Sequence, residues 1–146
     1  MAYPDLAVGQ SASMAKTITA ADIQAFADLT GDHNPMHLDA GFAARGRFGE
    51  RIAHGMLSAG LLSAVVGMKL PGPGALYMSQ SLRFVGPVKI GDTITARAEI
   101  LELVPEKRRV RLATTCTNQR GETVLTGEAL LKVDDVNPDL PFPTHP

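Results

Sequence analysis

Hydrophobic and polar positions divide the chain into a helical first half and a strand-rich second half. Residues 19–70 show helical spacing interrupted by loops, whereas residues 76–133 show apolar residues in the alternation typical of strands. The second half predicts four strands joined by short turns, which favour antiparallel pairing. A further strand is expected at and just before residues 16–19. The four predicted strands are residues 76–85, 93–104, 109–118 and 123–133.

One of these strands carries a signal of irregularity. Within residues 93–100 every second residue is apolar, and the alternation then shifts by one position at Leu101 and Leu103. Such a shift predicts a β-bulge, in which one extra residue is inserted into one strand of a pair.

The helical half has clear start and stop signals. The first helix is predicted to begin after Thr19, with Asp22 completing a variant of the capping box, and to end at Gly31. A short helix is predicted to follow the N-cap residue Asp39. Between them, Pro35 disfavours helix, so residues 32–38 are expected to form an irregular loop.

Residues 52–68 are apolar or small on every side. A helix of this kind is expected to be buried on every side, and the uncharged stretch at 55–68 is too short to span a bilayer. The strands of the second half are the elements available to cover it. We therefore expect an α+β fold in which a curved antiparallel sheet wraps around one long buried helix.

Length and composition fit one domain. The chain has 146 residues, enough for a core, with 45% apolar and 20% charged residues, which excludes a disordered chain. We expect residues 1–133 to form this domain and the proline-rich residues 134–146 to form an exposed tail. The 14 basic and 15 acidic residues give a net charge of −1, which argues against a nucleic-acid partner.

The expected location is the cytoplasm. The single cysteine excludes an internal disulfide and a zinc site built on several thiolates, and it favours a reducing compartment. Residues 1–10 lack the basic stretch and apolar run of a signal peptide, and no segment predicts a membrane partner.

Candidate chemistry is concentrated in the proline-stiffened loop. Asp32 and His37 lie five residues apart there, and such a pair can hold one water molecule and transfer its proton. Taken singly, the aspartate is also typical of a turn, and the histidine of a loop residue bonded to backbone. Asn34 more simply fixes the loop than reacts, because its amide can bond backbone in a turn.

A metal site is the alternative for the same loop, because His33, His37, Asp32 and Asp39 are clustered. Two histidines four residues apart bind zinc when they lie on a helix. Pro35 lies between them and argues against a helix, so no metal is expected.

The start of the apolar helix supplies further candidates. Unpaired N–H groups at a helix N-terminus favour negative charge, and Gly55 would let an oxyanion approach its N–H closely; alternatively, Gly55 only permits close packing. Ser58 either faces a pocket near substrate or bonds the carbonyl four residues back. His54 is interpreted as a structural polar cap rather than a base.

Three segments carry a resemblance to a known family. These are TGDHNPMHLD at residues 30–39, HGMLSAG at 54–60 and PVKIGD at 87–92. In this order they resemble the MaoC-like hot-dog family, and most closely its small (R)-specific enoyl-CoA hydratases, which feed polyhydroxyalkanoate synthesis. The resemblance covers roughly residues 15–133.

The resemblance implies a hot-dog fold, a homodimer, and hydration of trans-2-enoyl-CoA to (R)-3-hydroxyacyl-CoA. It implies that Asp32 and His37 are the catalytic pair, supports Gly55 as the oxyanion donor, and implies no cofactor beyond the coenzyme A thioester that is the substrate. The basic residues 107–111 would suit the phosphates of coenzyme A, or more simply form a solvated hairpin tip.

Two other functions remain open. A thioesterase on the same fold would be expected to carry a carboxylate on the central helix, and residues 52–70 contain none. A non-catalytic acyl-thioester-binding regulatory subunit would be natural if Asp32 or His37 were missing, and both are present.

Overall fold

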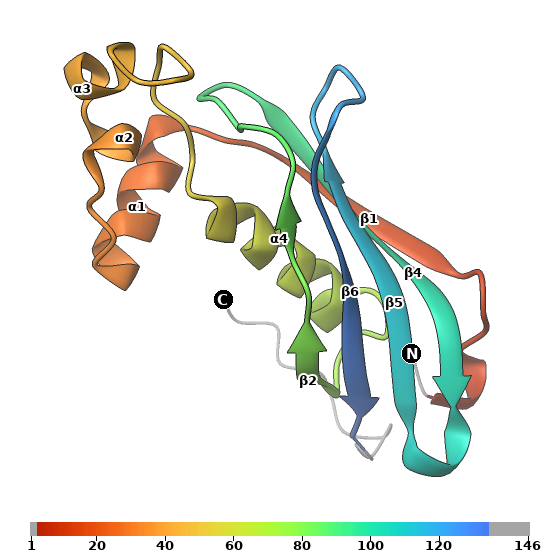
Figure 1. The fold of residues 1–146 in the computed structure, drawn as a ribbon. Helices are drawn as coiled ribbons and strands as arrows, with labels where there is room; N and C mark the ends of the chain where they lie inside the picture. Colours follow the sequence, from red (N-terminus) through yellow and green to blue (C-terminus); the bar gives the residue numbers. More distant parts are fainter. Residues whose placement is uncertain (1–2, 135–146) are drawn as a thin grey trace.

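A computed structural model describes residues 3–134, in which one antiparallel sheet curves around helix α4 (Figure 1). The predicted tail at 134–146 lies outside the described residues except for Asp134. The elements in chain order are η1 (Tyr3–Asp5), β1 (Ser11–Thr17), α1 (Ala20–Thr30), α2 (Pro35–Leu38), α3 (Ala40–Ala44), α4 (Gly55–Met68), β2 (Ala75–Gln80), β3 (Arg83–Phe84), β4 (Thr93–Val104), η2 (Pro105–Lys107), β5 (Arg109–Thr117) and β6 (Thr123–Val133).

The sheet confirms the predicted antiparallel pairing. Its order is β1-β4-β5-β6-β2, with the short strand β3 paired to β6. The predicted bulge is present, because the register between β4 and β5 shifts between Ile100 and Glu102. The strand expected at residues 76–85 is interrupted rather than continuous: residues 81–82 separate β2 from β3. The Ser81 N–H still donates to the Glu128 carbonyl at 2.9 Å, and the Ser81 backbone oxygen lies against Gly127 of β6. A Cβ at Gly127 would fall 1.8 Å from that oxygen, so this close approach requires glycine.

The ends of α1 and α3 are as the sequence predicts. Thr19 and Asp22 bond reciprocally as a capping box, and Gly31 ends α1 in the left-handed conformation with φ 84°. The Asp39 carboxylate accepts from the Phe42 N–H and caps α3. The expectation of an irregular loop at residues 32–38 is wrong in its second half, where α2 forms with Pro35 in its first turn. Proline fits there because the first N–H of a helix has no intrahelical acceptor.

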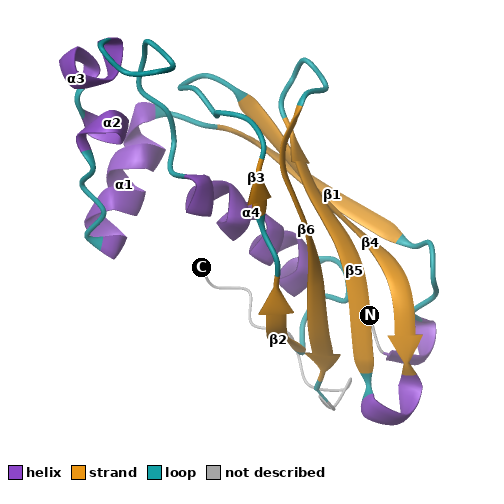
Figure 2. Cartoon of the chain, viewed as in Figure 1, coloured by secondary structure: helices purple, strands orange, loops and turns teal. Residues whose placement is uncertain are grey.

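The central helix packs on the sheet with one side only, which corrects the prediction that it is buried all round (Figure 2). Its inner side places Leu62, Val65 and Val66 in the core against strand residues. Its outer side leaves Met56 and Met68 55% and 57% exposed. The helix begins at Gly55, within the apolar stretch of residues 52–68 and at the position expected for its N-terminus. The sheet around the helix is the hot-dog arrangement, and it places the N-terminus of α4 beside α1 and α2. Within residues 3–134, no helix has the length and apolar character needed to cross a membrane.

Candidate active site

The loop between α1 and α2 is held by hydrogen bonds from its own side chains. The Asp32 carboxylate accepts from the Asn34 N–H at 3.2 Å, and the Asn34 side chain accepts from the Met36 N–H at 3.1 Å. Asn34 is therefore the N-cap of α2, and these bonds support its role as the residue that fixes the loop. Asp32 itself is exposed.

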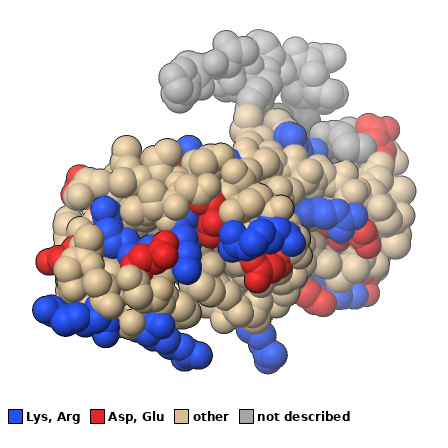
Figure 3. Space-filling model, turned by 90° about the horizontal axis from the view of Figure 1, so that it is seen from above, with Lys and Arg blue, Asp and Glu red and all other residues tan. Residues whose placement is uncertain are grey.

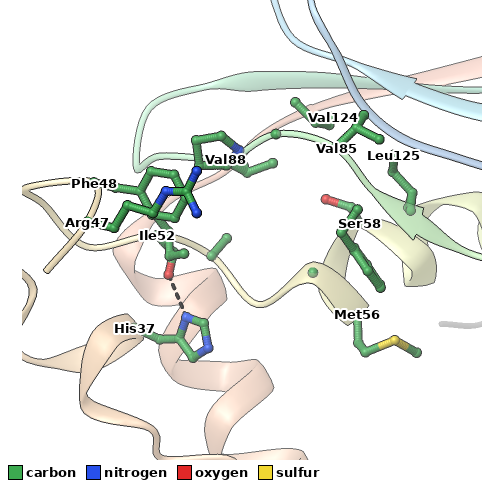
Figure 4. Close-up of a pocket in the computed structure, with 15 residues that line it drawn as sticks. His37, Arg47, Phe48, Ile52, Met56, Ser58, Val85, Val88, Val124 and Leu125 are labelled. Carbon is green, nitrogen blue, oxygen red and sulfur yellow. Dashed lines mark hydrogen bonds between the residues drawn. The ribbon is translucent and has the colours of Figure 1, made fainter.

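His37 lies in α2 and is 8% exposed. Its Nδ1 lies 2.7 Å from the backbone oxygen of Ile52 (Figure 4). A carbonyl oxygen only accepts, so Nδ1 carries the proton and Nε2 of the neutral ring has a free lone pair. The Arg51 side chain donates to the His37 carbonyl at 2.7 Å. Residues 51 and 52 therefore fix both the backbone and the ring of His37.

The predicted pair is brought together with a third residue, His54. One carboxylate oxygen of Asp32 and one ring nitrogen each of His37 and His54 lie within 4.8 Å of one another. His54 is the N-cap residue of α4, but its side chain makes no cap hydrogen bond, so the expectation of a structural polar cap is wrong. Its Nε2 instead lies 3.0 Å from the Asp32 backbone oxygen.

The metal alternative was based on a cluster that the structure does not assemble. His33 turns to Asp28, with 3.1 Å between Nε2 and the carboxylate, and this hydrogen bond raises the pKa of His33. Asp39 is occupied as a helix cap. Asp32, His37 and His54 instead lie close enough to hold a cation, and each histidine bonds a backbone carbonyl through only one of its ring nitrogens.

A largely apolar cavity of about 620 Å³ opens at the N-terminus of α4 (Figure 4). Its walls come from the start of α4, the segment before it, the loop after β3 and the start of β6. His37, Gly55 and Ser58 line it, whereas Asp32 and Asn34 do not. The structure therefore places three of the five predicted site residues on the cavity wall and the other two in the adjoining loop.

Gly55 allows the sheet to approach the helix closely. A Cβ at this position would lie 2.6 Å from two ring carbons of Phe84 on β3, so the packing role considered for Gly55 is present. Gly55 is also the first residue of α4, where backbone N–H groups have no intrahelical acceptor. The two roles are compatible because packing uses the Cα side and oxyanion binding would use the N–H.

Ser58 is 2% exposed, and its hydroxyl has no hydrogen-bond partner within residues 3–134. The alternative in which it bonds the carbonyl four residues back is wrong, because that bond is not formed. Its oxygen points toward the cavity in Figure 4. The Cys116 thiol donates to the Ser58 carbonyl, and burial raises the pKa of Cys116 to about 12, which makes this thiol a poor nucleophile.

Charges on the surface are mixed. On the face shown in Figure 3, basic side chains lie beside acidic ones. Arg111 pairs with Glu102 and Glu128, and Arg108 lies over the Tyr3 ring and donates to the Val133 carbonyl. Because these two arginines have partners within the chain, the hairpin around residues 107–111 is better explained as a solvated hairpin tip than as a phosphate site.

Comparison with known proteins identifies the family. The family described as MaoC like domain matches residues 6–124. The chain belongs to the MaoC-like family. Among curated relatives of this family, the 3-hydroxybutyryl-CoA dehydratase of Methylorubrum extorquens is 54% identical over 90% of this chain and 83% of its own length. The (R)-specific enoyl-CoA hydratase of Rhodospirillum rubrum is 53% identical over 90% of both chains.

A solved MaoC-like structure has the same architecture. The R-hydratase PhaJ1 from Pseudomonas aeruginosa, in its unliganded form, superposes with a TM-score of 0.86 and 46% identity. The match covers 99% of this chain and 96% of that one. The MaoC-like fold expected from the three sequence segments is thus confirmed.

Two features near the site were missed by sequence reasoning. Phe84 and Arg47 both border the cavity, and neither carries a sequence signal because each reaches it from a separate segment. His54 was visible as a histidine at a helix start, but its bond to Asp32 joins residues 22 positions apart.

Proposed function

We propose that this chain is an (R)-specific enoyl-CoA hydratase, a hydro-lyase that reversibly adds water to trans-2-enoyl-CoA to give (R)-3-hydroxyacyl-CoA. The observation that carries the proposal is the Asp32 carboxylate beside the His37 ring at the edge of an apolar cavity. The names of the relatives support it, since they are hydratases and dehydratases of acyl thioesters.

The geometry suits addition of water to a conjugated thioester. With Nδ1–H of His37 held by the Ile52 carbonyl, the pair Asp32 and His37 can bind water and accept its proton. The hydroxyl oxygen bonds to the β-carbon, the double bond becomes an enolate, and a proton from the pair goes to the α-carbon. The thioester itself acidifies the α-position, so the chemistry requires no further cofactor.

Gly55 and Ser58 are proposed to bind the substrate. The Gly55 N–H would donate to the thioester oxygen as negative charge develops there, which lowers the energy of the enolate-like transition state. The Ser58 hydroxyl, which has no partner among the residues described, faces the same cavity and would hydrogen-bond a polar atom of the acyl thioester. Asn34 would act indirectly by holding the Asp32 loop.

The decisive experiment follows the absorbance of the enoyl thioester, with crotonyl-CoA and a longer enoyl-CoA as substrates. We expect Asp32→Asn and His37→Ala to lower kcat by about two to four orders of magnitude. Asp28→Asn is the matched control, because it removes an exposed carboxylate on α1 and is expected to keep the activity. Release of free thiol instead would indicate the thioesterase, and binding without either signal would indicate the regulatory subunit.

We also propose that the protein is a homodimer. Apolar side chains on the outer side of α4 and on the edge strand β2 are exposed, including Met56, Met68, Leu76 and Met78. An exposed apolar patch beside a sheet edge is a surface that a second copy can cover. Sedimentation equilibrium is expected to give twice the chain mass of 15.5 kDa, and Leu76→Lys is expected to shift the mass toward one chain. A location in the cytoplasm stays a prediction.

A further inference from the structure

His54 connects the three elements that meet at the site. Its ring is 3% exposed and stands at the start of α4, with Nε2 3.0 Å from the Asp32 backbone oxygen. Its ring centroid lies 3.9 Å from that of His37 on α2 and 4.6 Å from that of Phe26 on α1. One buried ring thus contacts the loop residue and the helix residue that form the proposed pair.

Only one of the two ring nitrogens of His54 has a hydrogen-bond partner among the described residues. The Asp32 carbonyl only accepts, so Nε2 carries the proton and Nδ1 has the lone pair. Nδ1 is buried and has no partner among the described residues. Burying an unpaired polar atom is unfavourable, and an apolar side chain of similar size would avoid that penalty. A histidine at this position is therefore explained by its N–H donor, which reaches the Asp32 backbone oxygen.

The hydrogen bond from His54 holds a loop that is otherwise exposed to solvent. Asp32 is solvent-exposed, and its other hydrogen bonds, both of 3.2 Å, join it to Thr30 at the end of α1 and to Asn34 in the loop, each only two positions away. The bond from His54 links Asp32 to the start of α4, the helix that also presents Gly55 and Ser58 to the cavity. The same ring lies against His37, whose Nδ1 is already tied to Ile52.

We infer that His54 is a positioning residue for the reaction: its Nε2–H fixes the Asp32 backbone, and with it the loop that leads into α2 and His37, relative to α4. The inference rests on the proposed function of Asp32 and His37. His54 does not line the cavity, so it acts through these two residues and does not touch the substrate.

The test uses two amides that differ in reach. Glutamine at position 54 can place an N–H near the position of Nε2, whereas the shorter asparagine cannot. In crotonyl-CoA hydration we expect His54→Asn to lower kcat by about 10- to 100-fold with KM changed by less than about twofold, because misplaced catalytic groups reduce turnover. His54→Gln is expected to recover at least about tenfold of that loss. His54→Phe, which keeps an aromatic ring without a donor, is expected to resemble His54→Asn.

A second readout does not depend on turnover. In ¹⁵N-histidine NMR spectra, the wild type is expected to show a slowly exchanging Nδ1–H signal from His37, assigned by its loss in His37→Ala. This signal is expected to broaden in His54→Asn and to return in His54→Gln. Thr114→Val is the control for general loss of stability, since Thr114 is buried and hydrogen-bonded in β5, away from the loop.

The outcomes separate the two proposals. Equal kcat values for the Gln and Asn variants, or the same NMR change in Thr114→Val, would overturn the positioning role. If the wild type hydrates no enoyl-CoA but the His37 signal follows the donor at position 54, the hydratase proposal fails and the positioning inference stands.

Discussion

Strand β5 and the segment from residue 31 to residue 58 follow opposite rules. In β5 every second side chain is buried, without exception, from Arg109 to Thr117. Thr114, its buried hydroxyl, accepts a hydrogen bond from Gln80 at 3.0 Å. In the segment 31–58, by contrast, His54 and Ser58 each have a buried polar atom with no hydrogen-bond partner in the part of the chain that the structure describes.

The difference separates folding from function. A strand in which pattern, burial and hydrogen bonding agree is stabilised by every residue it contains. Burying polar atoms without hydrogen-bond partners, as beside this apolar cavity, lowers the stability of the fold. Such a loss of stability is expected at sites that bind a ligand. Substitutions in β5 should therefore affect stability more than activity, and substitutions in the segment 31–58 should affect activity more than stability.

The largest expected effect is on stability, in the sheet. Leu112 is fully buried in β5, and Leu112→Ala is expected to lower the free energy of unfolding by about 2–5 kcal/mol because it leaves a cavity. Urea denaturation measures this. Leu29→Ala is the control, since Leu29 is 84% exposed and should change stability by less than about 0.5 kcal/mol. Equal losses would mean that burial does not govern stability here.

Gly55 belongs to the segment 31–58 and packs against the sheet at Phe84 of β3. Gly55→Ala is expected to lower stability by about 1–3 kcal/mol, because the new Cβ would overlap the Phe84 ring. Phe84→Ala should remove most of that penalty, and a double-mutant cycle in urea measures the coupling. If the two losses simply add, the contact with Phe84 is not the reason for glycine.

Ser58 sharpens the comparison because stability and activity should move in opposite directions. Ser58→Ala removes an unpaired buried hydroxyl and is expected to raise stability by about 1 kcal/mol, while KM for enoyl-CoA rises. Thr114→Val removes a paired hydroxyl and should lower stability. Thermal unfolding and initial rates test both, and a stability loss in Ser58→Ala would show that its hydroxyl does have a partner.

The smallest expected effect is a pH dependence at the turn before β4. Asp92 is 5% exposed; burial raises its pKa, but bonds from Gln119 and the Lys89 N–H outweigh this, so its pKa lies below the usual 3.8. A lowered folded-state pKa contributes stability above about pH 4 that is lost as the pH falls through the folded value.

Asp92→Asn removes this titration. We expect its unfolding free energy to fall less steeply than that of the wild type as the pH is lowered below about 4, with a difference under about 1 kcal/mol. Urea denaturation at several pH values measures the slope. Parallel curves for both proteins would mean that Asp92 does not contribute to acid sensitivity.

Local signals in the sequence anticipated most of the architecture. The capping box at Thr19 and Asp22, the bulge after Ile100 and the bounds of β4 and β6 are all as predicted. The misses arose where context outweighed propensity. Pro35 was interpreted as a helix breaker, although at the first turn of α2 it is compatible with helix.

The sequence by itself determined most of the elements, the antiparallel pairing of strands joined by short turns, and the short segment that carries both Asp32 and His37, because each depends on neighbours within a few residues. Only the tertiary structure decided the tautomer of His37, the bond from His54 to Asp32 and the packing of Phe84 on Gly55. It also decided that α4 keeps one exposed side. These features join residues distant along the chain, and a periodicity of hydrophobic positions carries no information about which distant segments meet.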